Sequence, residues 1–101
     1  MPKNGEVNSL SEYRIYETEQ FLKDLQQDFS GQKEKIHKKL ISYVYPQLKL
    51  NPYYGKNINK LVNYKPDTWR YRVENYRFFY TIDDHRKIVF MIAADNRQSA
   101  Y

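Results

Sequence analysis

Three arginines, Arg70, Arg72 and Arg77, lie within one aromatic segment, Trp69–Tyr80. A guanidinium group stays protonated at neutral pH, and its planar fork can contact two phosphate oxygens at once. Arginines gathered in so short a segment can also stabilise the negative charge that develops on phosphate oxygens during cleavage of a phosphodiester. This segment is therefore the first candidate for a site that binds or cleaves nucleic acid.

The same segment predicts a β-hairpin. Its residues are mostly aromatic or β-branched, and Glu74-Asn75 supplies a two-residue turn in which Asn tolerates positive φ. In this register Arg72 lies opposite Arg77, and all three arginines share one face with Phe79 because side chains alternate between faces. The other face receives Trp69, Tyr71, Phe78 and Tyr80.

Placing Arg72 against Arg77 destabilises a sheet, since like charges repel each other across neighbouring strands. We therefore interpret the arginine face as a surface for a polyanion. The alternative interpretation is a solvated strand face whose arginines point apart.

The overall composition is that of one folded domain. The chain has 101 residues, 41% of them hydrophobic, and no cysteine. We expect residues 1–10 to form a flexible tail and residues 11–101 a single domain. The lack of cysteine excludes disulfides and fits a reducing cytoplasm. No apolar run is long enough to span a membrane, and the N-terminus lacks the apolar core of a signal peptide.

The charge distribution points to nucleic acid. Net charge is +5, and residues 35–82 carry ten Lys or Arg against two carboxylates, Asp67 and Glu74. This basic block also contains many of the chain's tyrosines. Cationic groups beside aromatic faces are typical of surfaces that hold single-stranded nucleic acid. A membrane surface is the weaker interpretation, because no strongly amphipathic basic helix is present.

Two amphipathic helices precede the arginine segment. The first is expected after Thr18, a good N-cap residue, and ends at Ser30-Gly31. The second begins near Gln32, and Pro46 is expected to kink it or to end it near Tyr45. The predicted buried positions are Phe21, Leu22, Leu25, Phe29, Ile36, Leu40, Ile41, Val44 and Leu48.

The fold class expected from this order is α+β. An N-terminal strand and a two-helix hairpin pack on an antiparallel sheet of about four to five strands. The helices cover one sheet face, so the arginines are expected on the other. A last strand beside the hairpin would bring Arg97 and Tyr101 to the same face. Besides the hairpin, strands are expected at residues 12–17, 58–64 and 87–94, with a turn at residues 83–86.

Several of these residues match a known family. The succession W-R-Y-R-V, N-Y-R-F-F-Y-T-I-D-D, I-V-F-M-I, N-R and a final Y resembles the C-terminal half of the RelE/ParE toxin superfamily of toxin–antitoxin modules. The strand–helix–helix start and Lys60-Leu61 fit as well, so the resemblance spans nearly the whole chain. It implies a fold like that of microbial ribonucleases. In the RelE branch it implies cleavage of mRNA in the ribosomal A site without a metal or other cofactor.

The resemblance also implies roles for individual residues. Arg70 and Arg72 occupy the positions of two basic residues one apart on a strand, and Arg77 follows the turn as in the RelE branch. Arg97 matches an arginine after the last strand, and Tyr101 matches a tyrosine near the C-terminus. The arginines suit charge stabilisation, Tyr101 suits the general base that takes the 2′-hydroxyl proton, and Arg97 suits the leaving oxygen.

This chain departs from the family pattern in two places. Many relatives carry His where this chain has Asn96, and the chain ends at Tyr101, so a carboxylate adjoins the phenol. These departures are expected to affect the rate of cleavage or the preferred target more than the class of toxin. The ParE branch, which acts on DNA gyrase, generally lacks the arginine set, so four matched arginines favour the ribonuclease branch.

Four further residues are weaker candidates for RNA contacts. Lys56 and Lys60 suit backbone phosphates, Phe79 suits base stacking, and Asn96 stands at the His position. The remaining titratable groups are interpreted as structural. We interpret His37 and His85 as exposed surface histidines. We interpret Asp83 and Asp84 as ordinary residues of a turn rather than as metal ligands.

The sequence therefore predicts a ribosome-dependent mRNA endonuclease toxin, neutralised by a cognate antitoxin that covers the basic face. Three alternatives stay open: a gyrase-directed toxin on the same fold, a non-enzymatic RNA-binding module, and an inactive relative of the toxins.

Overall fold

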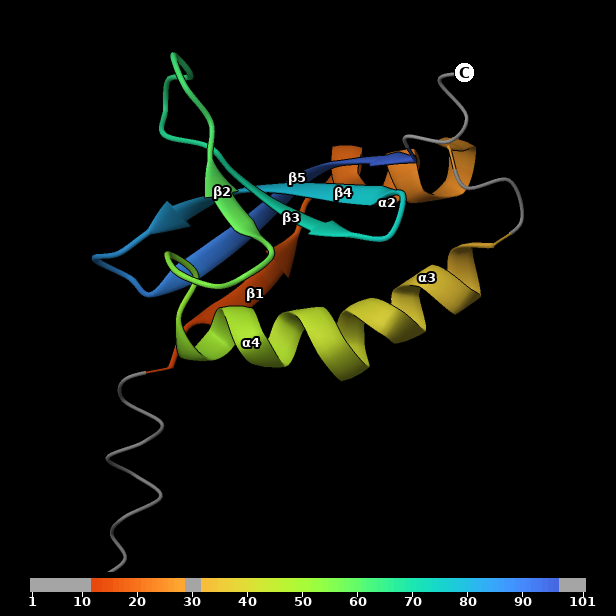
Figure 1. The fold of residues 1–101 in the computed structure, drawn as a ribbon, viewed down its shortest axis with the longest axis horizontal. Coiled ribbons are helices and arrows are strands. Elements are labelled where there is room, and N and C mark those ends of the chain that lie inside the picture. The colour runs from red at the N-terminus through yellow and green to blue at the C-terminus, as the bar shows by residue number, and fades with distance from the viewer. Residues whose placement is uncertain (1–11, 29–31, 97–101) are drawn as a thin grey trace, which may run out of the picture.

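The computed structural model describes residues 12–28 and 32–96. It consists of one five-stranded sheet with a helical layer packed on one face (Figure 1). The predicted α+β class is confirmed. No helix in the described ranges is long and apolar enough to cross a membrane. The elements are β1 (Arg14–Glu17), α2 (Glu19–Asp28), α3 (Lys33–Lys39), the π-helical turn η1 (Leu40–Val44), α4 (Tyr45–Leu50), β2 (Ile58–Lys60), β3 (Trp69–Val73), β4 (Tyr76–Asp83) and β5 (Ile88–Asn96).

The strand order is β1-β5-β4-β3-β2. Strands β2 to β5 form an antiparallel meander, whereas β1 pairs in parallel with β5, so the sheet is mixed. The helical segments carry the chain from β1 at one edge of the sheet to β2 at the other. The last strand lies beside the hairpin, as predicted. The predicted tail at residues 1–10 lies outside the described residues.

The hairpin register is confirmed at every predicted pair. Val73 lies opposite Tyr76, and Arg72 lies opposite Arg77. The turn differs in one detail, because the residue at positive φ is Glu74 (54°) rather than Asn75. A positive φ strains the backbone of a non-glycine residue. It occurs here because a two-residue turn needs positive φ to match the twist of the two strands that it joins.

The core fills the space between the sheet and the helical layer. The rings of Phe21 on α2 and Phe78 on β4 lie 6.2 Å apart, and the Tyr71 hydroxyl donates to Gln47 Oε1 on α4 at 2.6 Å. Burying each large apolar side chain stabilises the fold by about 1.5–3 kcal/mol. The fully buried side chains are Phe21, Leu25, Ile36, Leu40, Val44, Leu48, Tyr71, Phe78, Tyr80, Val89 and Met91.

Helix α2 begins as predicted. The Thr18 hydroxyl accepts the backbone N–H of Phe21 at 3.3 Å and donates to the Met91 carbonyl at 2.7 Å, so this cap also joins the helix to β5. Leu22 was predicted to be buried but is 37% exposed. A single helix face is fully covered by the sheet, and Leu22 lies beside it. Phe29 and the predicted end at Ser30-Gly31 lie outside the described residues.

The second helical segment does not end near Tyr45. It runs to Leu50, with the π-helical turn η1 just before Pro46. Proline clashes with the carbonyl four residues earlier, and a π-turn relieves such a clash by widening the helix. The Tyr45 N–H accordingly bonds to the Leu40 carbonyl, five residues back. Ile41, predicted to be buried, is 56% exposed on this widened turn.

Strand β2 is shorter than predicted, ending at Lys60 instead of residue 64. Asn63 has a positive φ of 66°, which turns the chain away from the sheet. The Leu61 N–H still reaches the Thr68 carbonyl at 2.9 Å. The excursion between them exposes Val62 and Tyr64.

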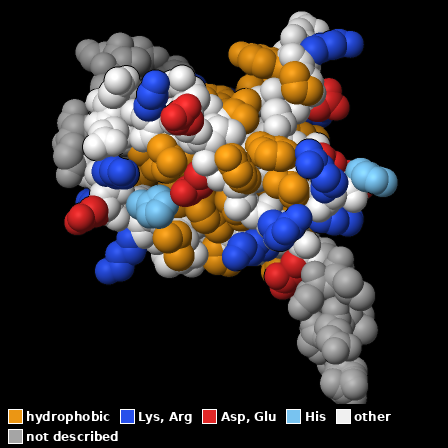
Figure 2. All heavy atoms as spheres, turned by 180° about the vertical axis from the view of Figure 1, so that it is seen from behind, with side chains coloured by type: hydrophobic (Ala, Val, Ile, Leu, Met, Phe, Trp, Pro, Cys, Tyr) orange, Lys and Arg blue, Asp and Glu red, His pale blue; other side chains and the backbone are white. Residues whose placement is uncertain are grey.

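Seen from behind, apolar side chains of the molecule reach the surface among scattered Lys and Arg groups (Figure 2).

The turn between β4 and β5 ties the sheet to the loop after α4. Asp84 accepts hydrogen bonds from the hydroxyls of Tyr13 and Tyr53, the latter at 3.2 Å. These hydrogen bonds hold the pKa of the Asp84 carboxyl below its ordinary value. The same cluster raises the pKa of Tyr53 to about 12, with burial as the main cause.

We expect Asp84→Asn to lower the unfolding temperature at pH 7. A depressed carboxyl pKa contributes stability above the unfolded-state pKa, about 3.9, and loses it as pH falls through the lower folded-state pKa. The difference from wild type should therefore shrink below about pH 4. Thermal unfolding followed by circular dichroism between pH 2 and 7 measures this. A difference that stays constant over that range would contradict the assignment.

Candidate nucleic-acid interface

The three arginines of the hairpin share the sheet face opposite the helical layer. Tyr71, between Arg70 and Arg72, is fully buried under the helices, so its two neighbours point the other way. Arg72 pairs directly with Arg77, and Arg70 pairs with Phe79. The predicted gathering of these side chains on one face is confirmed.

A cleft of about 430 Å³ lies beside this face, at the sheet edge where β2 begins. Arg70 and Arg72 line it together with Lys56, so the structure brings this predicted phosphate contact to the arginines. Asn59 lies opposite Arg70 on β2, and the Arg72 N–H bonds to the Asn57 carbonyl at 2.9 Å. The full lining is Tyr43, Lys56, Asn57, Asn59, Arg70, Arg72, Val73 and Glu74.

Two amides of this cleft, Asn57 and Asn59, were missed by the sequence analysis. Both carry donors and acceptors that suit sugar hydroxyls or base edges. Their only signal was proximity to Lys56 and Lys60 in the chain, and asparagines in a loop are ordinary turn residues. The pairing of β2 with β3 is what brings them to the arginines.

The charge of the arginine face is only partly balanced. Arg77 donates to Asp95 Oδ2 on β5 and forms an ion pair with it. Neither Arg70 nor Arg72 has a carboxylate partner within residues 12–28 and 32–96. The buried Nε atoms of Arg70 and Arg77 also have no hydrogen-bond partner in that part of the chain. An unpaired buried donor costs about 1–3 kcal/mol, so this arrangement works against fold stability.

Phe79 is half-buried on the arginine face, between Arg70 on β3 and Ala93 on β5. Its ring is thus placed beside a guanidinium group and reaches solvent. The position is compatible with base stacking, which stays a prediction.

Lys60 does not join the arginines. Lys60 lies opposite Trp69, the neighbour of Arg70 on β3, so its side chain is on the face of the sheet that the helices cover. Its ammonium lies 3.2 Å from Asp67 Oδ2 and 5.8 Å from the Trp69 ring centroid. Sequence spacing could not reveal this, because it depends on the register between β2 and β3.

The C-terminal candidates are only partly covered by the structure. Asn96 is the last residue of β5 and lies opposite Tyr76. Its neighbour Asp95 belongs to the arginine face, so the side chain of Asn96 is on the opposite face of the sheet. Its predicted RNA contact remains a prediction. Arg97 and Tyr101 lie outside the described residues.

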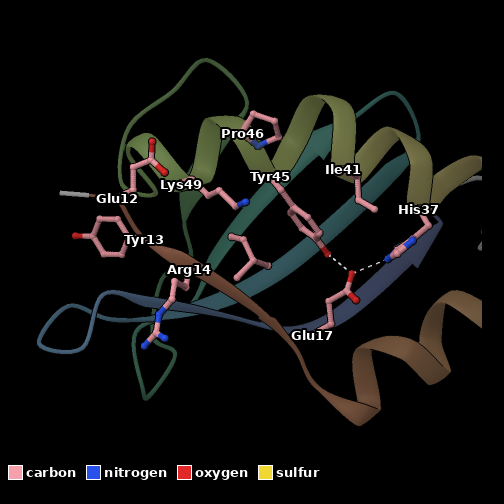
Figure 3. A pocket seen from close by; sticks show the side chains of 10 residues that line it. Glu12, Tyr13, Arg14, Glu17, His37, Ile41, Tyr45, Pro46 and Lys49 are labelled. Atoms are coloured by element: carbon pink, nitrogen blue, oxygen red, sulfur yellow. Dashed lines mark hydrogen bonds and ion pairs between the residues drawn. The ribbon is translucent and has the colours of Figure 1, made fainter. Parts of the chain in front are cut away.

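A second groove lies between β1 and the segment α3–α4 (Figure 3). At its floor, Glu17 Oε2 accepts the Tyr45 hydroxyl at 2.6 Å and contacts His37 Nε2 at 2.9 Å. Burial, followed by the hydrogen bond to Glu17, raises the pKa of the Tyr45 phenol, which therefore stays protonated. His37 was predicted to be exposed but is half-buried in this contact. Since Glu17 pairs with the buried Met91, this groove opens on the helix side, away from the arginine face.

Comparison with known proteins gives a family match and several structural matches. Residues 15–101 match the family described as the ParE toxin of the type II toxin–antitoxin system parDE. No curated protein matches in sequence. The toxin–antitoxin complex RelBE2 from Mycobacterium tuberculosis contains a chain with 22% identity and a TM-score of 0.66, covering 85% of this chain and 99% of that one.

Two further solved structures share the fold. The isolated RelE toxin of Escherichia coli has 26% identity and a TM-score of 0.57, with 83% of each chain covered. A chain of the RelE–RelB complex from Pyrococcus horikoshii has 20% identity and a TM-score of 0.61, covering 85% of this chain and 96% of that one. At these identities the likeness concerns mainly the fold.

Proposed function

Because the chain belongs to the ParE toxin family of type II toxin–antitoxin systems, we propose that it is a toxin that cleaves messenger RNA in the ribosomal A site without a metal ion. The observation that carries this proposal is the arginine face. Arg72 lies directly opposite Arg77 and two positions from Arg70 on the same strand face. The buried Nε atoms of Arg70 and Arg77 have no hydrogen-bond partner among residues 12–28 and 32–96. A fold gains nothing from such repulsion, whereas a phosphodiester would balance it.

The proposed reaction is attack of the ribose 2′-oxygen on the adjacent phosphorus, followed by departure of the 5′-oxygen. Arg70, Arg72 and Arg77 orient the phosphate and stabilise the extra negative charge of the pentacoordinate state. In this proposal Tyr101 takes the 2′-hydroxyl proton as a phenolate favoured by nearby guanidinium groups. Arg97 stabilises the departing oxygen. The ribosome supplies part of the alignment of the message.

The cleft beside β2 suits the flanking nucleotides. Lys56 offers a cation to a backbone phosphate there, and the Asn59 amide, opposite Arg70, can read a sugar or base edge. Phe79 offers a stacking surface on the same face. Lys60, held by Asp67 on the other face, is a weaker candidate than Lys56.

We further propose a cognate antitoxin as the partner that neutralises the toxin in the cytoplasm. Structures of similar fold include toxin–antitoxin complexes from Mycobacterium tuberculosis and Pyrococcus horikoshii. A protein that covers the arginine face with carboxylates would block RNA and relieve the charge repulsion at once.

A cell-free translation reaction with a defined message tests the proposed activity. Adding the purified toxin should stop protein synthesis, and primer extension on the message should reveal new 5′ ends at codon positions. Omitting ribosomes should greatly reduce those ends. Arrest without new ends would contradict cleavage of the message.

A gyrase-directed toxin is the second candidate, because the family match is to ParE. It would inhibit supercoiling by DNA gyrase and leave translation intact, so the two assays separate the candidates. A non-enzymatic RNA-binding module would instead protect the message without new ends, and an inactive relative would affect neither assay.

A further inference from the structure

Among the described residues, Asp95 is the only carboxylate that forms an ion pair with one of the three hairpin arginines. It lies directly across from Arg77 in the β4–β5 register, and the two side chains form an ion pair. The other ion pairs of the described residues, such as Lys39 with Glu74 and Lys60 with Asp67, do not involve the three hairpin arginines.

The contact is only partly protected from water. The side chain of Arg77 is 19% exposed and that of Asp95 is 38% exposed. The hydrogen bond to Asp95 uses one terminal nitrogen of the Arg77 guanidinium group, and the buried Nε has no partner in the described part of the chain. Asp95 therefore accepts a hydrogen bond from one nitrogen of the Arg77 guanidinium group and does not contact that group through two nitrogens. A phosphate that contacts two donors at once can compete with such a partner.

We propose that Asp95 is a positioning residue that holds Arg77 in place in the free protein and is displaced from it by an RNA phosphate. This inference rests on the proposed function, because the competitor is RNA. Two opposite effects follow. The Asp95 carboxylate stabilises the folded protein by offsetting the repulsion between Arg72 and Arg77, and it weakens RNA binding by occupying Arg77.

Asp95→Asn tests both effects at once. The probe is a 2′-O-methyl oligoribonucleotide, which cannot be cleaved. Removing the carboxylate should tighten its binding by about fivefold, the change in affinity that corresponds to losing a partly exposed ion pair. It should also steepen the dependence of log affinity on log salt by about 0.7, because one more cation is neutralised by RNA. The same variant should unfold at a lower temperature than wild type.

Two variants serve as controls. Glu34→Gln changes net charge by the same amount on the exposed side of α3, and should leave the salt slope unchanged. In the double variant Arg77→Ala/Asp95→Asn, the second substitution should no longer affect binding, since its partner is gone. A purely structural role for Asp95 would lower stability without changing the salt slope.

The outcomes separate this inference from the proposed function. If wild type binds the oligonucleotide through Arg77 but Asp95→Asn leaves affinity and slope unchanged, only the inference is overturned. If neither wild type nor Asp95→Asn binds it, the inference is overturned, whereas the proposed function is tested separately by message cleavage in the cell-free translation reaction. Asp95→Ser provides a second neutral variant should Asn prevent folding. In wild type, the carbon NMR signal of the Asp95 carboxyl should shift when the oligonucleotide is added, and an unmoved signal counts against displacement.

Discussion

Replacing Arg77 by alanine should abolish growth arrest and slow message cleavage by roughly 100- to 1000-fold, the usual cost of removing one donor that stabilises transition-state charge. Arg77 sits at the centre of the arginine face, opposite Arg72 on β3 and Asp95 on β5. The fold should survive, because a partly exposed ion pair contributes at most about 1 kcal/mol and the repulsion with Arg72 disappears as well.

The measurement is primer extension on a message in cell-free translation, with growth of cells expressing the variant as a second readout. Arg86→Ala is the matched control. It removes the same side chain from the exposed turn beyond the far end of β4, where Arg86 pairs with Asp83 at 2.8 Å. Undiminished growth arrest by Arg77→Ala would reject its role, and equal losses in both variants would indicate a general charge effect.

Replacing Tyr71 by alanine should destabilise the protein by about 3–5 kcal/mol, the range for removing a large buried aromatic side chain. Tyr71 is fully buried, its ring lies 6.5 Å from that of Tyr43, and its hydroxyl donates to Gln47 on α4. It is the side chain that anchors β3 to the helical layer between Arg70 and Arg72. Its removal should therefore disturb both arginines as well as the core.

Equilibrium unfolding in urea measures this change, with cleavage assayed in parallel. Tyr71→Phe is the control, because it keeps the ring and loses only a partly buried hydrogen bond to Gln47, at a cost of about 0.5–1.5 kcal/mol. Arg72→Ala provides the contrast: it should reduce cleavage with little change in stability, since Arg72 is exposed. A Tyr71→Ala variant as stable as wild type would contradict this account of the core.

Much of the site could be predicted from local sequence. The hairpin register followed from a two-residue turn and a period of two, and both are properties of neighbouring residues. The same reasoning placed the arginines on one face and Tyr71 on the other. The capping role of Thr18 was equally local, because its partner Phe21 is three residues away.

The errors have a common origin in contacts between distant residues. The exposure of Ile41, predicted to be buried, depends on the π-turn that accommodates Pro46. The sheet face taken by Lys60 depends on the β2–β3 register. His37 was expected at the surface, but its partner Glu17 lies twenty residues away in the chain. No window of sequence contains such pairs.

What the sequence by itself determined is a set of guanidinium groups on one strand face, since alternation along a strand needs no knowledge of the rest of the molecule. Only the tertiary structure decided what surrounds that face: Asp95 across from Arg77, and Asn57 and Asn59 in the cleft beside Arg70. These neighbours arrive on other strands and loops, and the packing of the whole sheet against its helices sets which residues meet.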